Sequence, residues 1–433
     1  MSGFKSLVEA ALRLFLIDPL TRLRDRLAPA LGYPQYSRLW QANAGSQIAF
    51  WMQQVAQGWL VLELTESAFA LGLLAFFRSI PMLVLSPIGG VLADRLDRRA
   101  IVITAQGLIG ITMLIIAILV QIERIHIVHL VLSSLVVGTS FAINMPSRTS
   151  LVAGLVPRQH LSNAIALHST TMNTARILGP SIAGLIIGAF GIAVTYFTQV
   201  LGYVWSTLNM FRITSPPRAK RPRTSTLTDL REGFAYVARS KTMLALMLLA
   251  LGPSLFGMPV IYLMPAFVRQ SLGAGPEALG FLLGSLGVGA LLGSVLVVTY
   301  SRFKFKGRVL FGSILMHGLL LVGMSFTRSI ETAAIAIAFV GFFQSVYMAT
   351  NQATLLLLVP DDLRGRVMSL RMMTFGLSPL GLLPMSYIAE VQGVSMAMWL
   401  GGSATFTVGV CVLIWARHLW SLQPEDERPP DRP

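Results

Sequence analysis

Long runs of apolar residues, separated by short polar stretches, follow one another from about residue 36 to residue 417. An α-helix needs about 20 residues to cross roughly 30 Å of hydrocarbon. The pattern therefore predicts an all-α polytopic membrane protein with twelve transmembrane helices. They are expected at residues 36–62, 67–93, 100–121, 126–148, 161–189, 192–211, 242–268, 277–300, 307–327, 331–357, 365–390 and 394–417.

Basic residues are concentrated in every second connection between these runs. The N-terminal region, the even-numbered connections and the C-terminal end carry most of the lysines and arginines. The odd-numbered connections contain only Arg124, Arg269 and Arg328. Because basic loops stay on the cytoplasmic side, and an even number of spans brings both ends to one side, we expect both termini in the cytoplasm.

The longest polar connection divides the spans six and six. It begins with a basic, proline-rich stretch and continues with Leu227, Leu230, Phe234 and Val237 at helical spacing, which predicts a flexible linker and a short surface helix. The expected domains are an N-terminal bundle at 36–211, the cytoplasmic linker at 212–241, a C-terminal bundle at 242–418 and a cytoplasmic tail at 419–433.

Residues 1–35 do not resemble a cleavable signal, since Asp18 and Pro19 interrupt a short apolar stretch. Apolar residues from Phe4 to Phe15 recur at helical spacing, with charged residues between them. Two interpretations remain open, an amphipathic helix in the cytoplasmic interface and a poorly ordered extension.

Short sequence matches recur in the two halves at nearly constant separation. Leu155-Val156-Pro157 precedes the fifth span, and the same tripeptide precedes the eleventh span 203 residues later. Ala70-Leu71-Gly72 opens the second span and recurs 208 residues later in the eighth. These matches indicate a duplicated six-helix unit, and an even number of spans per unit makes the two units parallel.

Composition excludes several other classes of protein. Only 12% of the residues are charged, where a soluble chain has about 25%. Basic cytoplasmic loops explain the net charge of +15 without nucleic acid. The one cysteine, Cys411, lies in an apolar run, and no metal spacing, nucleophile–base pair or phosphate loop is found. We expect no metal, no cofactor and no enzymatic activity.

The charged stretch between spans 2 and 3 carries a family resemblance. It contains Gly90, Asp94, Arg95, Arg98 and Arg99. These residues match the loop motif G-x-x-x-D-R-x-G-R-R, and together with the two six-span halves they make the chain resemble the major facilitator superfamily. Asp97 replaces the usual glycine, which puts the tightness of the turn in question. The resemblance covers about residues 36–418 and implies the major facilitator fold.

A second match lies in span 5, where Gly179, Pro180 and Gly184 follow Arg176. This segment looks like the family's antiporter motif, G-P-x-x-G-G, which accompanies export; a kink for helix packing is the alternative interpretation. With residues 51–60 and 173–184, the chain is similar to the bacterial branch of enterobactin-type siderophore exporters and drug or lysophospholipid transporters.

The charged turn is also a candidate conformational latch, since alternating access needs contacts that hold each of two states. We expect the Asp94 carboxylate at the positive N-terminus of span 11, with Arg364 or Arg366 as an ion-pair partner. Gly90 belongs to the same turn, and Arg95, Arg98 and Arg99 are expected to set orientation and to contact lipid phosphates. Alternatively, the turn sets orientation alone.

Arg78 and Arg176 fall near the middle of their spans, where charge is costly and usually marks a pathway or a buried pair. One interpretation is that they present positive charge to an anionic group of a substrate. The other is that they hydrogen-bond to backbone and to neutral amides. The predicted cavity residues are Asn43, Gln47, Gln54, Arg78, Asn173, Arg176, Tyr262, Gln344, Tyr347 and Asn351.

Three residues are candidates for proton coupling: Glu63 at the outer end of span 1, Asp94, and His168 in span 5. We expect a secondary active transporter that exports an amphipathic small molecule by alternating access with proton antiport, as a monomer among the lipids of a bacterial inner membrane. A siderophore or lysophospholipid carrier is an alternative, as is a transporter-like protein for assembly or sensing.

Overall fold

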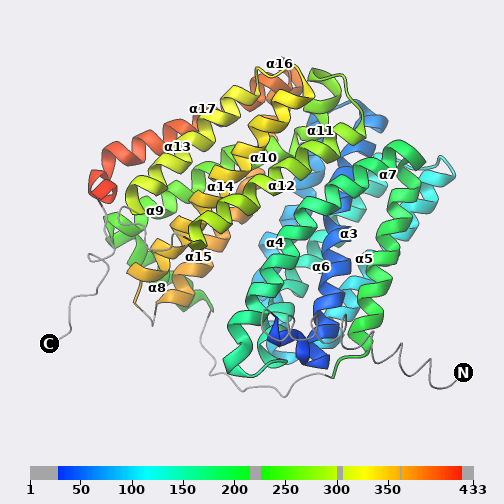
Figure 1. Cartoon of the computed structure of the whole chain (residues 1–433), viewed down its shortest axis with the longest axis horizontal. Helices are drawn as coiled ribbons and strands as arrows, with labels where there is room; N and C mark the ends of the chain where they lie inside the picture. The colour runs from blue at the N-terminus through cyan, green and yellow to red at the C-terminus, as the bar shows by residue number, and fades with distance from the viewer. Residues whose placement is uncertain (1–27, 215–225, 300–305, 361–362, 422–433) are drawn as a thin grey trace, which may run out of the picture.

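The computed structural model describes residues 28–214, 226–299, 306–360 and 363–421. Within these ranges the chain is built of helices without a strand, which confirms the all-α prediction (Figure 1). Most of the predicted amphipathic segment at residues 1–35 and of the tail at residues 419–433 lies outside the described residues.

The first half of the chain packs as one bundle of long helices, in which α3 packs against α7, α4 against α6, and α5 against both α6 and α7. Its elements are η2 (Pro29–Gly32), α3 (Pro34–Thr65), α4 (Ala68–Arg95), α5 (Arg98–Gln121), α6 (Ile127–Gly154), η3 (Arg158–His160) and α7 (Leu161–Phe211).

The helix α7 is a hairpin of two arms. Gly191 interrupts it with φ 85° and ψ 172°, outside the helical region. On one arm, Gly179 lies against Trp51 of α3, and on the other Gly202 lies against Gly45 of the same helix. A straight helix would hold Gly179 and Gly202 roughly 35 Å apart. The chain therefore turns back at Gly191, between the predicted fifth and sixth spans.

The second half begins with a broken helix, because Pro253, Pro259 and Pro265 interrupt the predicted seventh span with two π-helical segments, η4 and η5. Its elements are α9 (Lys241–Gly252), η4 (Pro253–Gly257), α10 (Met258–Tyr262), α11 (Met264–Ala266), η5 (Phe267–Ser271), α12 (Pro276–Thr299), α13 (Lys306–Met324), α14 (Ile330–Leu358), α15 (Arg364–Gly376), α16 (Ser378–Gln392), α17 (Val394–Trp415) and η6 (Arg417–Ser421).

Equivalent turns of the two halves share their backbone conformation. Gly191 and Gly393 have φ values of 85° and 92°, while Glu66 and Gly273 have φ values of 53° and 61°. The pairs are separated by 202 and 207 residues, one residue less than the separations of 203 and 208 between the sequence matches. Three of these residues are glycines, which adopt a positive φ readily, and Glu66 adopts it although it is uncommon outside glycine. Its recurrence at matching turns supports the duplicated unit.

Ten helical segments of the described chain are long and apolar enough to cross a membrane. The hairpin α7 counts once among them. The central helix α3, with 32 residues, is not one of the ten, because its asparagine and glutamine residues lower its hydropathy. The chain is thus a multi-pass membrane protein.

The two halves meet along two helix pairs, α7 with α12 and α4 with α16 (Figure 1). Glycine allows the first pair to approach closely. A Cβ atom added to Gly184 would lie 2.6 Å from the backbone oxygen of Pro276, and one added to Gly280 would lie 2.7 Å from that of Pro180. The interface between α7 and α12 therefore has no space for a larger side chain.

A short helix, α8 (Thr226–Arg239), lies in the connection between the halves and packs against α9 and α15. Glu232 of this helix forms an ion pair with Arg366 at the start of α15. The connection is therefore attached to the second half of the protein.

Candidate functional site

A cavity of about 310 Å³ lies between the two halves. Helices α3, α4, α6 and α7 line it from the first half, and α10, α11, α12 and α14 from the second. Most of the lining is apolar or aromatic. Its polar and charged members are Gln54, Gln57, Arg78, Ser134, Arg176, Tyr262 and Gln344, together with the indole of Trp51.

Arg78 reaches across the cavity from α4. Its Nη2 atom lies 3.4 Å from the Tyr262 hydroxyl of the second half. Its guanidinium carbon lies 5.4 Å from the centre of the Phe50 ring and 6.0 Å from that of Tyr262. Turning the Gln54 carboxamide over gives its oxygen hydrogen bonds from both Arg78 Nη atoms, and we assign it so because amide orientation follows the hydrogen bonds.

Arg176 makes the corresponding contact from α7. Its Nη2 atom donates a hydrogen bond to Gln344 Oε1, 3.2 Å away on α14. Its guanidinium carbon lies 5.7 Å from the centre of the Trp51 ring. The Nε–H group is buried without a hydrogen-bond partner, so Arg176 retains an unused donor.

The described lining contains two arginines and no carboxylate. The oxygen partners of Arg78 and Arg176 are a phenol and two amides, all neutral. Neutral partners satisfy hydrogen bonds but do not compensate charge, and an uncompensated charge in an apolar site is costly. The cavity is therefore electropositive.

Five of the ten residues predicted for the cavity line it: Gln54, Arg78, Arg176, Tyr262 and Gln344. The other five lie outside this lining. The amide of Asn43 lies 3.4 Å from His168 Nδ1, and that of Asn351 donates to the backbone oxygen of Leu246. Gln47 and Tyr347 are buried in their own halves and Asn173 is half-buried. The sequence pattern assigned these residues to their spans, but it did not predict which side of the helix each side chain occupies.

Two buried arginines, Arg148 and Arg371, were not singled out in the sequence, because each lies close to an end of its predicted span, 126–148 or 365–390. Arg148 lies inside α6, only 6% exposed, and its Nη2 atom donates to Ser46 Oγ at 2.8 Å. Arg371 lies inside α15, 3% exposed, and donates to Asn351 Oδ1 and Gln352 Oε1 at 3.2 and 3.3 Å. Each arginine links neighbouring helices of its own half.

The sequence repeat was the signal that could have found them. A separation of 203 residues, as between the Leu-Val-Pro tripeptides, pairs Arg148 with Asn351 and His168 with Arg371. The same two helix positions thus carry polar residues in both halves. This repetition indicates a shared structural role within the spans.

The residues of the antiporter-like motif are packing residues of two interfaces. A Cβ atom on Gly179 would lie 2.5 Å from Trp51 Cβ of α3, whereas Gly184 faces α12 across the boundary between the halves. Pro180 lines the cavity. The motif therefore connects the cavity wall to the contact between α7 and α12.

The charged turn ends α4 at Arg95 and starts α5 at Arg98. Asp97, which stands where the family has glycine, caps α5 by accepting a hydrogen bond from Arg99 N at 3.0 Å. The Arg99 side chain donates to the backbone oxygens of Met210 and Phe211, at 3.1 and 2.7 Å. Two of the Arg99 donor atoms thus cap the C-terminal end of α7, and the expected contact of Arg99 with lipid phosphates stays a prediction.

The predicted latch is described only in part. The side chains of Asp94 and Arg95, and position Gly90, lie outside the described side chains, so the contact of Asp94 with span 11 stays a prediction. Arg364 Nε donates to the backbone oxygen of Leu356 at 3.0 Å, and Arg366 forms an ion pair with Glu232.

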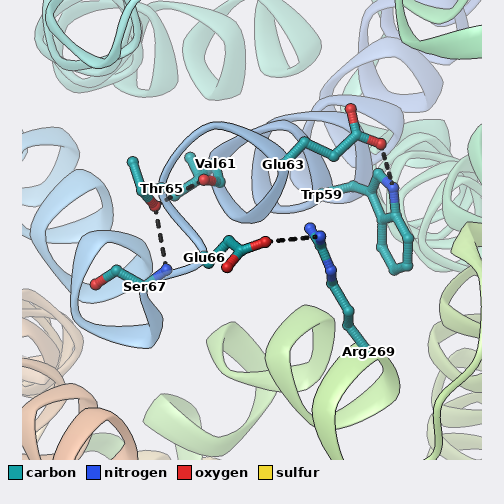
Figure 2. A network of polar contacts seen from close by, with 7 residues as sticks. All are labelled: Trp59, Val61, Glu63, Thr65, Glu66, Ser67 and Arg269. Atoms are coloured by element: carbon teal, nitrogen blue, oxygen red, sulfur yellow. Dashed lines mark hydrogen bonds and ion pairs between the residues drawn. The ribbon is translucent and has the colours of Figure 1, made fainter.

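The turn between α3 and α4 carries a polar network that reaches the second half (Figure 2). Glu66 Oε1 lies 3.6 Å from Arg269 Nη2 of η5. Beside it, Glu390 Oε2 of α16 accepts hydrogen bonds from Ser67 Oγ and Phe69 N, both at 3.1 Å. The two acids thus join the halves at the end of the molecule far from the start of α3.

Two of the three proton-coupling candidates, Glu63 and His168, lie outside the described cavity lining. Glu63 Oε1 accepts a hydrogen bond from Trp59 Nε1 at 2.8 Å near the end of α3 (Figure 2). His168 lies beside Asn43 in the first half. The Asp94 side chain is outside the described part.

The helices of two halves surround a shared cavity, and the family model and solved structures that match this chain are those of transporters with the major facilitator fold. The chain belongs to the transmembrane secretion effector family of that superfamily, whose model matches residues 26–431. The family resemblance found in the sequence is thereby confirmed.

Relatives of known name are transporters. The chain is 25% identical to the staphyloferrin A transporter of Staphylococcus aureus over 83% of this chain and 90% of that protein. It is 24% identical to macrolide efflux protein A of Streptococcus pyogenes over 88% and 96%. It is 25% identical to an enterobactin exporter of Shigella boydii over 61% and 63%.

Solved structures share the fold at low identity. A bacterial homologue of the human lysosomal transporter Spinster, inward-facing and unoccupied, matches with a TM-score of 0.69 at 15% identity, over 92% of this chain and 98% of that one. A peptide transporter matches with a TM-score of 0.73 at 12% identity, over 90% and 95%.

Proposed function

We propose that the protein exports an amphipathic small molecule from the bacterial cytoplasm by alternating access. Twelve spans cross the inner membrane, counting α3 and both arms of α7, and the termini lie in the cytoplasm. The observation that carries the proposal is the cavity lined by both halves, since a site shared by two parallel units is where such a carrier binds its cargo.

The contacts between the halves support an inward-facing state. Gly58 meets Pro265, Gly72 meets Ser386 and Gly188 meets Glu277, all toward the end of the molecule at which α3 finishes and α4 begins. The acid contacts of Glu66 and Glu390 lie at the same end. With the termini in the cytoplasm, this closed end faces outward.

Export is favoured by the family and by the relatives, of which two are named for efflux or export. Proton antiport is the proposed coupling, with Glu63, Asp94 and His168 as candidates. Glu63 and His168 lie outside the described cavity lining, so a proton carried by either of them would use a different group from the cargo.

The test is uptake into inverted membrane vesicles, in which the cytoplasmic face is outside. Labelled macrolide, enterobactin and staphyloferrin A serve as probes, with and without an acidified lumen. We expect accumulation of at least one probe, faster when the lumen is acid. Vesicles that hold the folded protein but accumulate none of the probes would contradict export of this class.

Alternating access is tested by closing the outer end. In a chain with Cys411→Ser, the variants Ser67→Cys and Glu390→Cys place two thiols at side chains that touch in the structure. A short, reducible cross-linker should stop uptake, and reduction should restore it. The single variant Ser67→Cys, treated alike, is the control. Uptake that continues after cross-linking contradicts opening at this end.

A further inference from the structure

We propose that the cargo is an amphipathic dianion, with two separate acidic groups that bind Arg78 and Arg176 and an apolar body between them. This inference rests on the proposed transport function and names the class of molecule transported. Such a cargo is complementary to the cavity, which has two positive groups and an apolar, aromatic wall.

The charge of the lining selects an anion. Arg78 and Arg176 are the charged residues of the described lining, and neither faces a carboxylate there. An arginine remains protonated in proteins, so the empty cavity carries two positive charges. A cationic cargo would add like charge in a low-dielectric site, whereas an anion would compensate it.

The donors of the two arginines are available to a ligand. A guanidinium has five N–H groups in a planar fork that matches a carboxylate or similar anion. Arg176 has its buried Nε–H unpaired and its Nη2 bound to the neutral Gln344. Arg78 donates from both Nη atoms to the neutral oxygen of Gln54 and makes a long contact, 3.4 Å, with the Tyr262 hydroxyl. An anion can replace these partners with a stronger, charge-assisted bond.

The positions of the arginines provide for two acidic groups. Arg78 lies over Phe50 and Arg176 over Trp51, which are consecutive residues of α3 with ring centres 5.7 Å apart. Each arginine also has its own amide partner, Gln54 for Arg78 and Gln344 for Arg176. Each guanidinium can therefore hold an acidic group of its own.

The wall between the arginines fits an apolar body. Leu74 of α4 and Leu283 and Leu286 of α12 line the cavity, and Met258 and Met348 add flexible thioethers. The rings of Phe50, Trp51 and Tyr262 provide flat surfaces beside the charges. A fully polar dianion would leave this wall unused.

A charge series on one ring system tests the proposal. Fluorescein at mildly alkaline pH is a dianion with its charges on two groups, its methyl ester is a monoanion, and rhodamine 123 is a cation. Their binding to the purified full-length protein is measured by fluorescence anisotropy. We expect fluorescein to bind at least about tenfold more tightly than its ester, and rhodamine 123 to bind least.

The variants Arg78→Gln and Arg176→Gln should each weaken fluorescein binding about tenfold. Only one of the two variants should weaken binding of the ester, because the ester has one acidic group left and only the arginine that binds this group contributes. Neither should weaken binding of rhodamine 123. The variants Arg78→Lys and Arg176→Lys keep the charge and should restore most of the affinity, which separates loss of charge from loss of folding. The exposed Arg328→Gln is the matched control.

Rhodamine 123 that binds as tightly as fluorescein would overturn the proposal, as would fluorescein binding that survives both glutamine variants. Transport in proteoliposomes separates this result from the proposed function. If the cation is transported and the dianion is not, the result supports export and contradicts the dianion site. If the dianion binds through both arginines but is not transported, the result supports the site and contradicts export of dianions.

Discussion

Arg371 Nε donates to Asn351 Oδ1 at 3.2 Å, and the Asn351 amide donates in turn to the backbone oxygen of Leu246 at 3.1 Å. This chain of hydrogen bonds joins α15, α14 and α9 at one buried point. It lies in the second half of the protein, apart from the cavity, and its role is to hold three spans together.

The variant Arg371→Lys should therefore destabilise the protein while keeping the charge. Lysine cannot reach the three acceptors that the guanidinium of Arg371 contacts, so buried oxygens lose their donors at a cost of about 1–3 kcal/mol. The measurement is thermal unfolding in detergent, followed by tryptophan fluorescence. Arg328→Lys, at an exposed position, should unfold like the wild type; an unchanged Arg371→Lys would show that the network contributes nothing.

The variant Gly184→Val should push the two halves apart at their closed end. Its side chain has no space beside Pro276 and Gly280, so the state in which α7 and α12 touch becomes costly. In a chain with Cys411→Ser and Ser67→Cys, labelling by an impermeant maleimide in intact cells should increase severalfold. Gly107→Val, whose Cβ meets open space, is the control, and equal labelling of the two variants would contradict this expectation.

Glu390 and Glu66 should contribute unequally to the closed end. Glu66 and Arg269 are 3.6 Å apart with side chains 83% and 35% exposed, and such pairs are worth about 0–1 kcal/mol. Glu390 binds both the cap of α4 and a backbone N–H. The measurement is again maleimide labelling in intact cells, with the reporter cysteine placed by Phe69→Cys. Glu390→Ala should raise this labelling more than Glu66→Gln does. High salt should mimic only Glu66→Gln, and the reverse order would refute the assignment.

The membrane potential should accelerate export if the cargo is a dianion. Each charge that crosses a potential of 100 mV changes its free energy by about 2.3 kcal/mol. In inverted vesicles, a lumen made positive by potassium and valinomycin should speed fluorescein uptake, and a negative lumen should slow it. In these vesicles, antiported protons would leave the lumen while the dianion enters it, and both movements make the lumen more negative. A positive lumen therefore favours uptake with or without antiport. Uptake insensitive to potential would exclude net movement of charge.

The periodicity of the sequence was enough to predict the fold class, because apolar length decides whether a segment can cross a membrane. It was also enough to single out Arg78 and Arg176, since a charge inside an apolar run is visible without a structure. The break at Gly191 was predictable as well, because it falls between the fifth and sixth predicted spans, 161–189 and 192–211.

Direction around a helix axis could not be predicted. Asn43, Gln54 and Asn351 all lie on spans next to the cavity, but only Gln54 lines it. Which side of a helix faces its neighbour depends on tilt and on close approaches such as that of Gly45 and Gly202. Those distances involve residues far apart in the chain, and no local pattern contains them.

The partners of Arg78 and Arg176 have a mechanical consequence. Both arginines belong to the first half, and they donate to Tyr262 and Gln344 of the second. The donors proposed to hold a cargo are thus the ones that connect the two halves. An anion that takes these donors on entering would break both contacts, so we expect the protein with cargo bound to be less rigid than the protein without it.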